Sequence, residues 1–438
     1  MSVTPNRVTV RMYQVGFGDC FLITFAYNTA PLPDGRRERH ILIDFGSTRW
    51  PKNYPPRYRE LANDIALKTG GKLDVLVITH RHKDHLGGFG DDKAAATIAT
   101  LKPSLVLRSW TENPTAAANA TGPAFVGQRS LAFANGLDTA QAFAGEVART
   151  LRNQRQGFRA ELADAAIEQL ANEDAIGHLD KLAKDAISAP GYLFAGQPSG
   201  IDAIVPGVTT KVLGPPTIDQ WPAVAGEREN DPEYWLRQRN LLAGMLQTVK
   251  APPALIRVAN STGRRQTIDP GPLRWIVERM RDQQTHSLLR IVTSLEDALN
   301  NTSIILQFQT GTRRMLFPGD AQIENWSYAL TSPKATTLRA DLADLDLYKV
   351  GHHGSRNASP RSLVKQWQPH KRPFVALMST LAHVHGKTEA TAVPRQSLVD
   401  ALKALGTLHQ TDGLDTTKMS LAVTASTRDR KAFDLIPG

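Results

Sequence analysis

The chain has 438 residues and a formal net charge of +10, with 21% charged and 41% hydrophobic residues. This length favours a core with large insertions or two domains, and the composition is that of a soluble globular protein. No run of about 18 apolar residues occurs, and the first residues lack the apolar stretch of a signal peptide, which argues against a membrane partner and for the cytoplasm. The single cysteine, Cys20, excludes an intramolecular disulfide and a thiolate metal site.

The positive charge is unevenly distributed along the chain. Residues 111–190 carry a net charge of −3 and residues 218–297 a net charge of +1, so the remaining segments carry +12. A basic surface concentrates anions, so we expect an anionic substrate, with phosphate as the leading class. A basic surface without catalytic meaning is the alternative.

The N-terminal part has the pattern of a β-meander followed by a helix. Residues 8–15 alternate polar and apolar side chains, and residues 21–25 and 41–43 continue the strand pattern. Residues 58–68 show helical periodicity, and residues 73–78 are apolar and rich in β-branched side chains. Strand, helix and strand in this order indicate an α/β fold.

A cluster of metal-ligand side chains directly follows the strand at residues 73–78. His80 and His82 are two residues apart, and Asp84 and His85 follow at once. A tight loop or a first helical turn could aim these side chains at one or two cations. Their mixture of nitrogen and oxygen ligands suits zinc, with manganese as the alternative ion. A solvated polar loop is the competing interpretation, and the number and placement of the ligands favour metal.

Two segments differ in character from the rest of the chain. Residues 111–190 are rich in alanine, and an apolar stripe that includes Leu179 and Leu182 predicts helices. In this segment we expect His178 at the surface or at a cap. Residues 218–297 contain further helical patterns, and their tryptophans favour packing between helices over stacking on bases. We interpret both segments as largely helical insertions, through which a protein partner could bind.

The segment 298–438 repeats the pattern of polar ligands at strand ends. A β-hairpin is predicted within residues 300–317, and Asp320 follows its second strand. A strand at residues 345–350 precedes His352 and His353. The remaining predicted elements are a closing helix at residues 394–405 and a final strand at residues 419–425. Strand ends gather ligands from distant parts of the sequence into one site.

The motif from His80 to His85 resembles the HxHxDH signature of the metallo-β-lactamase superfamily. Four other stretches narrow the resemblance to its ComEC-type branch, named for the soluble hydrolase domain of a bacterial DNA-uptake protein. They are residues 15–23 (VGFGDCFLI), 41–46 (ILIDFG), 317–320 (FPGD) and 347–355 (LYKVGHHGS). The resemblance implies an α/β fold, the four-layer αββα metallo-β-lactamase sandwich. The implied divisions of the chain are core residues 1–110, 191–217 and 298–438, with insertions at 111–190 and 218–297.

The resemblance also implies a site for one or two metal ions. The implied ligands are His80 and His82 for a first ion, Asp84 and His85 for a second, Asp320 as a bridge, and His352 or His353 as the closing ligand. We favour His353 because it directly precedes the glycine. No histidine in a suitable loop completes the ligand set of the first ion, so this site is expected to be weak or completed by water. In its place, Asn300-Asn301-Thr302-Ser303 resembles the Asn-x-Ser stretch of the ComEC-type branch. Asp44 resembles the aspartate that supports the metal loop through hydrogen bonds rather than coordination.

Four residues are candidates for catalytic roles. Asp84 could orient water as a base, and Ser303, or alternatively Asn301, could contact metal-bound water or substrate. Lys349 lies near the site by sequence, and His385 matches the position of a rim histidine in the ComEC-type branch, although glycine replaces the proline that usually follows it.

The leading hypothesis is a metal-dependent hydrolase, a phosphodiesterase or nuclease with nucleic acid as its anionic partner. One alternative is a hydrolase of lactone, thioester or β-lactam bonds, which uses the same fold. The other is a nucleic-acid-binding or protein-binding module in which the metal is structural.

Overall fold

The structure is a computed structural model that describes residues 3–28, 31–113, 172–225, 299–333, 339–340, 342–355, 359–367, 372–382, 384 and 392–436. The described residues up to 224 and from 299 onward belong to one compact unit. Most of each predicted insertion, residues 114–171 and 226–298, lies outside the described residues. The boundaries of the insertions therefore stay predictions.

Two mixed β-sheets form the centre of this unit. The first has eight strands in the order β14-β13-β1-β2-β3-β4-β5-β6, and the second has six in the order β12-β11-β10-β9-β8-β7. The strands of the first sheet are β1 (Arg7–Tyr13), β2 (Phe21–Ala26), β3 (Glu38–Ile43), β4 (Val75–Val77), β5 (Leu105–Ser109), β6 (Gly191–Leu193), β13 (Ser420–Ser426) and β14 (Asp434–Ile436). Those of the second sheet are β7 (Val208–Gly214), β8 (Ile305–Thr310), β9 (Arg313–Phe317), β10 (Leu347–Lys349), β11 (Val375–Met378) and β12 (Thr407–Gln410).

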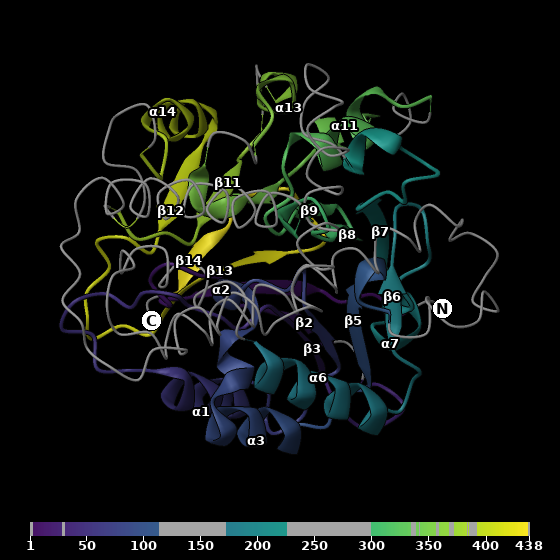
Figure 1. Cartoon of the computed structure of the whole chain (residues 1–438), viewed down its shortest axis with the longest axis vertical. Helices are drawn as coiled ribbons and strands as arrows, with labels where there is room; N and C mark the ends of the chain where they lie inside the picture. Colours follow the sequence, from purple (N-terminus) through teal and green to yellow (C-terminus); the bar gives the residue numbers. More distant parts are fainter. Residues whose placement is uncertain are drawn as a thin grey trace, which may run out of the picture. The chain divides into compact units, whose positions relative to one another are not determined.

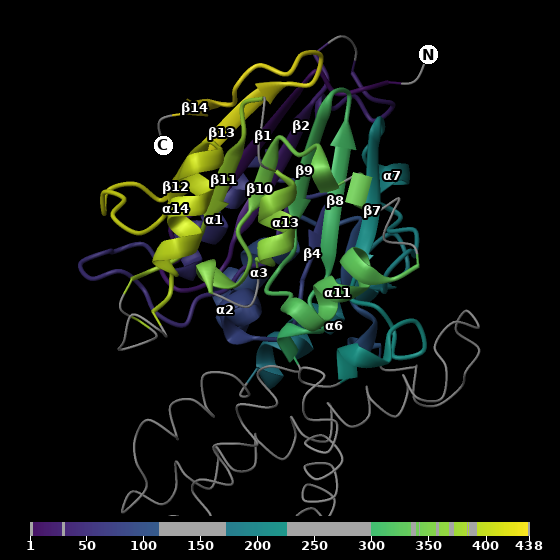
Figure 2. The same ribbon diagram turned by 90° about the horizontal axis from the view of Figure 1, so that it is seen from above.

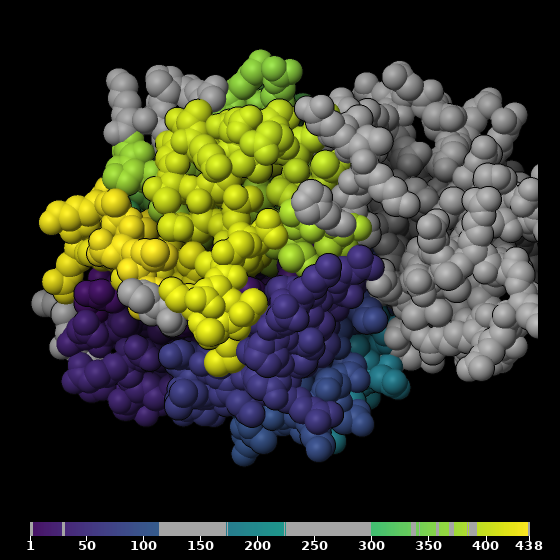
Figure 3. Space-filling view, turned by 90° about the vertical axis from the view of Figure 1, so that its left-hand side faces the viewer, coloured from purple at the N-terminus to yellow at the C-terminus, as the bar shows by residue number. Residues whose placement is uncertain are grey.

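The first sheet confirms the predicted N-terminal meander, because β1, β2 and β3 pair antiparallel. Parallel pairing then runs from β3 through β4 and β5 to β6. β13 pairs antiparallel with β1, so N-terminal and C-terminal segments of the chain lie side by side on the face shown in Figure 3. β13 was predicted as the final strand, and this is wrong: β14 follows it. The short β14 is too exposed to carry an apolar alternation.

The second sheet has the same division into antiparallel and parallel parts. β8 and β9 form the predicted hairpin, and β7 pairs antiparallel with β8. From β9 through β10 and β11 to β12 all pairs are parallel. Ligand sites in α/β folds form at the carboxyl ends of such parallel strands.

Helices cover the outer face of each sheet (Figure 1), and three apolar clusters pack these layers together. One lies between the two sheets and combines inward side chains such as Val10 and Phe317. A second lies between the first sheet and the helices α1 (Tyr58–Lys68), α3 (Asp92–Thr100) and α6 (Glu173–Asp185). The third lies between the second sheet and the helices α11 (Ile323–Thr331), α13 (Arg361–Gln366) and α14 (Gln396–Leu405). The predicted α/β class is confirmed.

Local sequence explains the elements that lead into the site. All three residues of β4 are buried, because Val75 and Val77 face the other sheet while Leu76 faces the helices. Helix α1 buries Leu61 and Ile65 on one face, as its periodicity predicts. Helix α6 falls within the segment predicted as the first insertion. Its stripe of Ala175, Leu179 and Leu182 packs in the same apolar cluster as α1 and α3.

Candidate metal centre

The predicted metal motif begins after β4 and extends into the short helix α2 (Lys83–Leu86), at the same end of the strands as α11 (Figure 2). His82 is extended, and its carbonyl accepts hydrogen bonds from the N–H groups of His85 at 2.9 Å and Leu86 at 3.1 Å. This turn holds the side chains of His80, His82, Asp84 and His85 in the interior, where each residue is less than 10% exposed. A solvated loop, the competing interpretation, does not fit this burial.

Asp44, at the end of β3, holds the motif in place. Its Oδ1 accepts a hydrogen bond from the Thr79 N–H, and its Oδ2 accepts one from the Thr79 hydroxyl, both at 2.8 Å. Oδ2 also lies 2.8 Å from Nδ1 of His85. An Nδ1–H donated to Asp44 leaves the lone pair of His85 Nε2 for a cation. The contacts match the supporting role expected of Asp44.

Two glycines allow the backbone to pack tightly around the motif. A Cβ on Gly46 would lie 2.3 Å from the carbonyl carbon of Asp84, and one on Gly88 would lie 2.4 Å from the Phe45 ring. Phe89 packs edge-on against Phe45 at a centroid distance of 5.6 Å. Only glycine fits such close approaches.

The first ligand group comes from the motif alone: His80, His82 and Asp84, whose ligand atoms lie within 4.8 Å of one another. Nε2 of His80 is 3.0 Å from Nδ1 of His82. Burial lowers the pKa of His80 well below its usual range, and burial lowers that of His82 to about 4. Both rings are therefore neutral at pH 7 and can offer a lone pair to an ion.

The second ligand group combines Asp84 and His85 with Asp320 and His353, again within 4.8 Å. His353 Nε2 lies 2.9 Å from Asp84 Oδ2, and His85 Nε2 lies 3.1 Å from Asp320 Oδ2. Nδ1 of His353 faces the carbonyl of Ser379 at 3.0 Å, which turns Nε2 toward the carboxylates. Residues from the ends of β4, β9 and β10 thus meet at one point.

The turn η4 (His352–Gly354) separates the two adjacent histidines that the sequence left as alternatives. His352 and His353 both have left-handed backbone, with φ of 45° and 54°. His353 points into the cluster and is fully buried. The N–H of His352 donates to Asp320 Oδ1 at 3.0 Å, whereas its ring lies 3.1 Å from the Ser355 hydroxyl. Among the described residues, the ligand groups include His353 and leave out His352.

The hydrogen bonding of this cluster fits a divalent cation. His85 Nε2 and Asp320 Oδ2 are buried and make no hydrogen bond, and the same is true of His82 Nε2. His85 Nε2 and Asp320 Oδ2 meet only as an ion pair at 3.1 Å. A buried polar atom without a hydrogen bond costs roughly 1–3 kcal/mol, and a cation between these atoms would offset that cost.

The charges fit as well. Burial alone would raise the pKa of Asp320, but His85 and Lys349 lower it well below its usual range. Burial alone would lower the pKa of His85, but Asp320 and Asp84 raise it well above its usual range. The surrounding carboxylates therefore attract positive charge to this point, either as the second proton of His85 or as a cation that would displace that proton.

Sequence reasoning missed Asp19 as a member of this site. Asp19 is buried and forms an ion pair with Lys349, which also donates to the carbonyl of Gly319 at 3.0 Å and to Asp320 Oδ1 at 3.4 Å. The backbone of Asp19 bonds to Asp84 and Gly46, so the Gly-Phe-Gly-Asp turn before β2 was the available signal. Asp19, Asp44 and His85 also form a ligand group, but Lys349 already supplies a positive charge there.

The other predicted catalytic residues have different outcomes. Lys349 is buried beneath Asp320 rather than solvated. The Ser303 hydroxyl accepts the N–H of Asp320 at 3.2 Å, so Ser303 positions this carboxylate. His385 lies outside the described residues.

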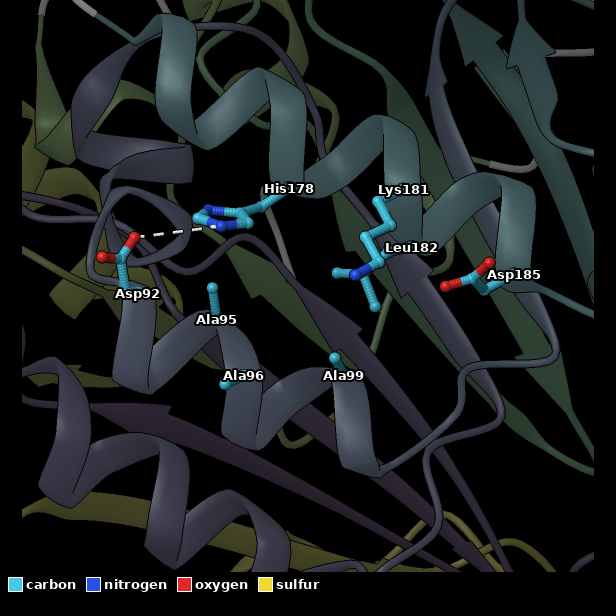
Figure 4. A pocket seen from close by; sticks show the side chains of 8 residues that line it. All are labelled: Asp92, Ala95, Ala96, Ala99, His178, Lys181, Leu182 and Asp185. Carbon is cyan, nitrogen blue, oxygen red and sulfur yellow. Dashed lines mark ion pairs between the residues drawn. The ribbon is translucent and has the colours of Figure 1, made fainter.

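His178 lies away from the cluster, in a surface hollow between α3 and α6 (Figure 4). It is near Asp92, with 3.9 Å between Nε2 and the carboxylate, and its Nδ1 lies 2.8 Å from the carbonyl of Phe89. Alanines of α3 and Leu182 of α6 line this hollow. The predicted surface position of His178 is confirmed.

Comparison with protein-family models and with curated proteins gave no match. Within the described part of the chain, no helix is long and apolar enough to cross a membrane.

Proposed function

We propose that this chain is a metal-dependent hydrolase with the four-layer metallo-β-lactamase sandwich, acting on phosphodiesters with zinc or manganese. The observation that carries the proposal is the buried cluster at the strand ends, where His85 Nε2 and Asp320 Oδ2 face each other without a hydrogen bond. The motif resemblance and the arrangement of helices on the outer faces of two sheets support the same class.

Bound metal would supply Lewis acidity, which lowers the pKa of water toward neutrality and polarises a phosphoryl or carbonyl oxygen. Asp84 belongs to both ligand groups. Burial alone would raise the pKa of Asp84, but His85 and His353 lower it, so this carboxylate is ionised at neutral pH and can orient the attacking water by accepting a hydrogen bond from it. Asp44 and the Ser379 carbonyl hold the two histidine rings in fixed orientations.

The charge distribution favours a phosphodiester over a neutral ester or lactam. The segments outside the two predicted insertions carry a net charge of +12, and these segments supply every residue of the cluster. A positive surface raises the local concentration of an anionic substrate. The same metal chemistry could open a lactone, thioester or β-lactam, so the choice depends on the substrate tested.

The test is metal analysis of the purified protein together with hydrolysis of bis-nitrophenyl phosphate, DNA and RNA in zinc or manganese. We expect one or two ions per chain. His82→Ala should reduce turnover by more than about 100-fold, because removing a metal ligand should reduce activity more than removing a residue that only orients a ligand. His409→Ala is the matched control, since His409 is a half-buried histidine outside the ligand groups.

Three outcomes would contradict the proposal. They are absence of turnover with any of these phosphodiesters, equal turnover by His82→Ala and wild type, and hydrolysis confined to lactone, thioester or β-lactam substrates. Bound metal without any hydrolysis would instead favour a structural metal in a binding module.

A further inference from the structure

A basic loop follows β3 and runs into the first turn of α1, and the metal site does not use it. We define the basic loop as residues 48–59, which contain four basic residues, Arg49, Lys52, Arg57 and Arg59, and no acidic residue. All four are exposed. Arg59 pairs with Asp91 at 3.2 Å, whereas neither Arg49 nor Lys52 pairs with a carboxylate among the described residues. The loop therefore offers positive charge that the fold does not neutralise.

The basic loop is tied directly to the metal cluster. The N–H of Phe17 donates to the carbonyl of Arg49, and the N–H of Thr48 donates to the carbonyl of Phe17, both at 2.8 Å. The Phe17 ring packs against the ring of His353, with 4.1 Å between centroids. One residue thus separates the start of the basic loop from a ligand of the second group.

The base of the loop is closed by one tyrosine. The Tyr58 hydroxyl donates to the Ser47 carbonyl at 2.7 Å and accepts the Ser47 N–H at 2.9 Å. Ser47 follows Gly46, which packs against Asp84 of the motif. Both ends of the basic loop are therefore fixed beside the metal cluster.

An aromatic stack orients one cation of the loop, Arg57. Trp50 is stacked on Tyr54 at 6.2 Å and meets Tyr58 edge-on at 5.0 Å. The guanidinium of Arg57 lies over the Trp50 ring, 5.3 Å from its centroid. Such a contact fixes a planar cation while its outer face stays available to a phosphate or a base.

We propose that the basic loop binds the phosphate backbone of a nucleic-acid strand whose scissile phosphodiester lies at the metal cluster. Arg49 and Lys52 contact phosphates, and the Arg57–Trp50 stack receives a base or a neighbouring phosphate. The proposal rests on the proposed hydrolase function and deepens it, because a polynucleotide reaches both the cluster and the basic loop whereas a small phosphodiester reaches only the cluster.

The experiment compares wild type with the double variant Arg49→Glu/Lys52→Glu and with Lys403→Glu, which reverses one charge on the outer helix α14. Binding of a fluorescein-labelled single-stranded 20-mer DNA is measured by anisotropy in EDTA at several salt concentrations. We expect the double variant to weaken binding by more than about 10-fold and to lower the salt slope by roughly 1.4, since each single-strand phosphate contact contributes about 0.7. Lys403→Glu should bind within about 2-fold of wild type.

Turnover separates this proposal from the hydrolase proposal. We expect the ratio of DNA hydrolysis to bis-nitrophenyl phosphate hydrolysis to fall in the double variant. Equal DNA affinity of the double variant and Lys403→Glu overturns the basic loop as a site and leaves the hydrolase proposal standing. DNA binding that depends on the loop, without turnover of either substrate, supports the site and contradicts the hydrolase. Loop-dependent binding to phosphatidylglycerol vesicles, but not to DNA, overturns the nucleic-acid proposal.

Discussion

The two ligand groups of the cluster differ in both origin and chemistry. His80, His82 and Asp84 come from five consecutive residues, whereas the second group adds Asp320 and His353 from distant strand ends. The first group has two histidines with lowered pKa values and one carboxylate. The second has two carboxylates and two histidines whose pKa values the carboxylates raise. The assembled group therefore has the greater demand for positive charge, and we expect it to hold its ion more tightly.

The strongest test of this difference is Asp320→Asn, which keeps the size of the side chain and removes its charge. We expect loss of the ion from the second group and a fall in bis-nitrophenyl phosphate hydrolysis of more than about 100-fold. Loss of a direct metal ligand should reduce activity more than loss of a residue that orients a ligand. Equilibrium dialysis with zinc gives the number of ions and their affinities. His82→Ala should remove only the weaker ion, so equal zinc binding by Asp320→Asn and wild type would refute the ranking of the two groups.

A smaller effect is expected from Lys349→Met, which removes the ammonium group beneath Asp320. Lys349 and the His352 N–H both bond to Asp320 Oδ1, which leaves Oδ2 to face His85. We expect zinc affinity to fall by about 10- to 100-fold, as is typical when a contact that orients a ligand is lost.

The same variant should destabilise the zinc-free fold by about 3–5 kcal/mol, because Asp19 and Asp320 lose a buried counter-charge. Urea unfolding in EDTA measures this decrease in the free energy of unfolding. The double variant Asp19→Asn/Lys349→Met should regain part of the stability, since it removes both partners of one buried pair. A double variant less stable than Lys349→Met would show that Asp19 is not held by this pair.

Sequence could predict the local group and only part of the assembled one. His80 to His85 are adjacent, so the strand before them and their spacing suffice. Asp320 and His353 could be predicted as ligands only from the family resemblance, because local periodicity does not indicate that the ends of β4, β9 and β10 meet. The choice between His352 and His353 depended on a left-handed turn, whose side-chain directions the sequence does not specify.

Asp19 was missed for a related reason. Its role depends on Lys349, 330 positions away, and an isolated aspartate after a glycine usually indicates a turn. The fold itself was easier to predict from the sequence, because the alternation of side chains in β1 and the helical spacing of apolar residues in α1 are local signals. The exposed edge strand β14 carries no such signal and was not predicted.

The smallest predicted effect concerns His40, a buried histidine of β3 outside the ligand groups. Its substitution distinguishes loss of folding stability at acid pH from loss of bound metal at acid pH. Burial lowers the pKa of His40 from 6.5 to about 4, and Asp74 only partly opposes this. The unfolded chain therefore binds more protons between pH 6.5 and 4, so the stability that neutral His40 contributes is complete above pH 6.5 and is lost as the pH falls.

In zinc-free protein, His40→Gln should reduce the loss of unfolding free energy between pH 7 and pH 5 by about 1–2 kcal/mol, measured by urea unfolding at each pH. Asp320→Asn should retain the loss of unfolding free energy that depends on His40, because His40 lies in β3 and is not one of the metal ligands. If His40→Gln and wild type lose stability in parallel, the acid sensitivity belongs to other buried groups, of which His80 and His82 share the lowered pKa. Adding zinc should then protect wild type until the pH falls toward 4, because an ion competes with protons for those two rings, whose pKa values are lowered, and does not compete at His40.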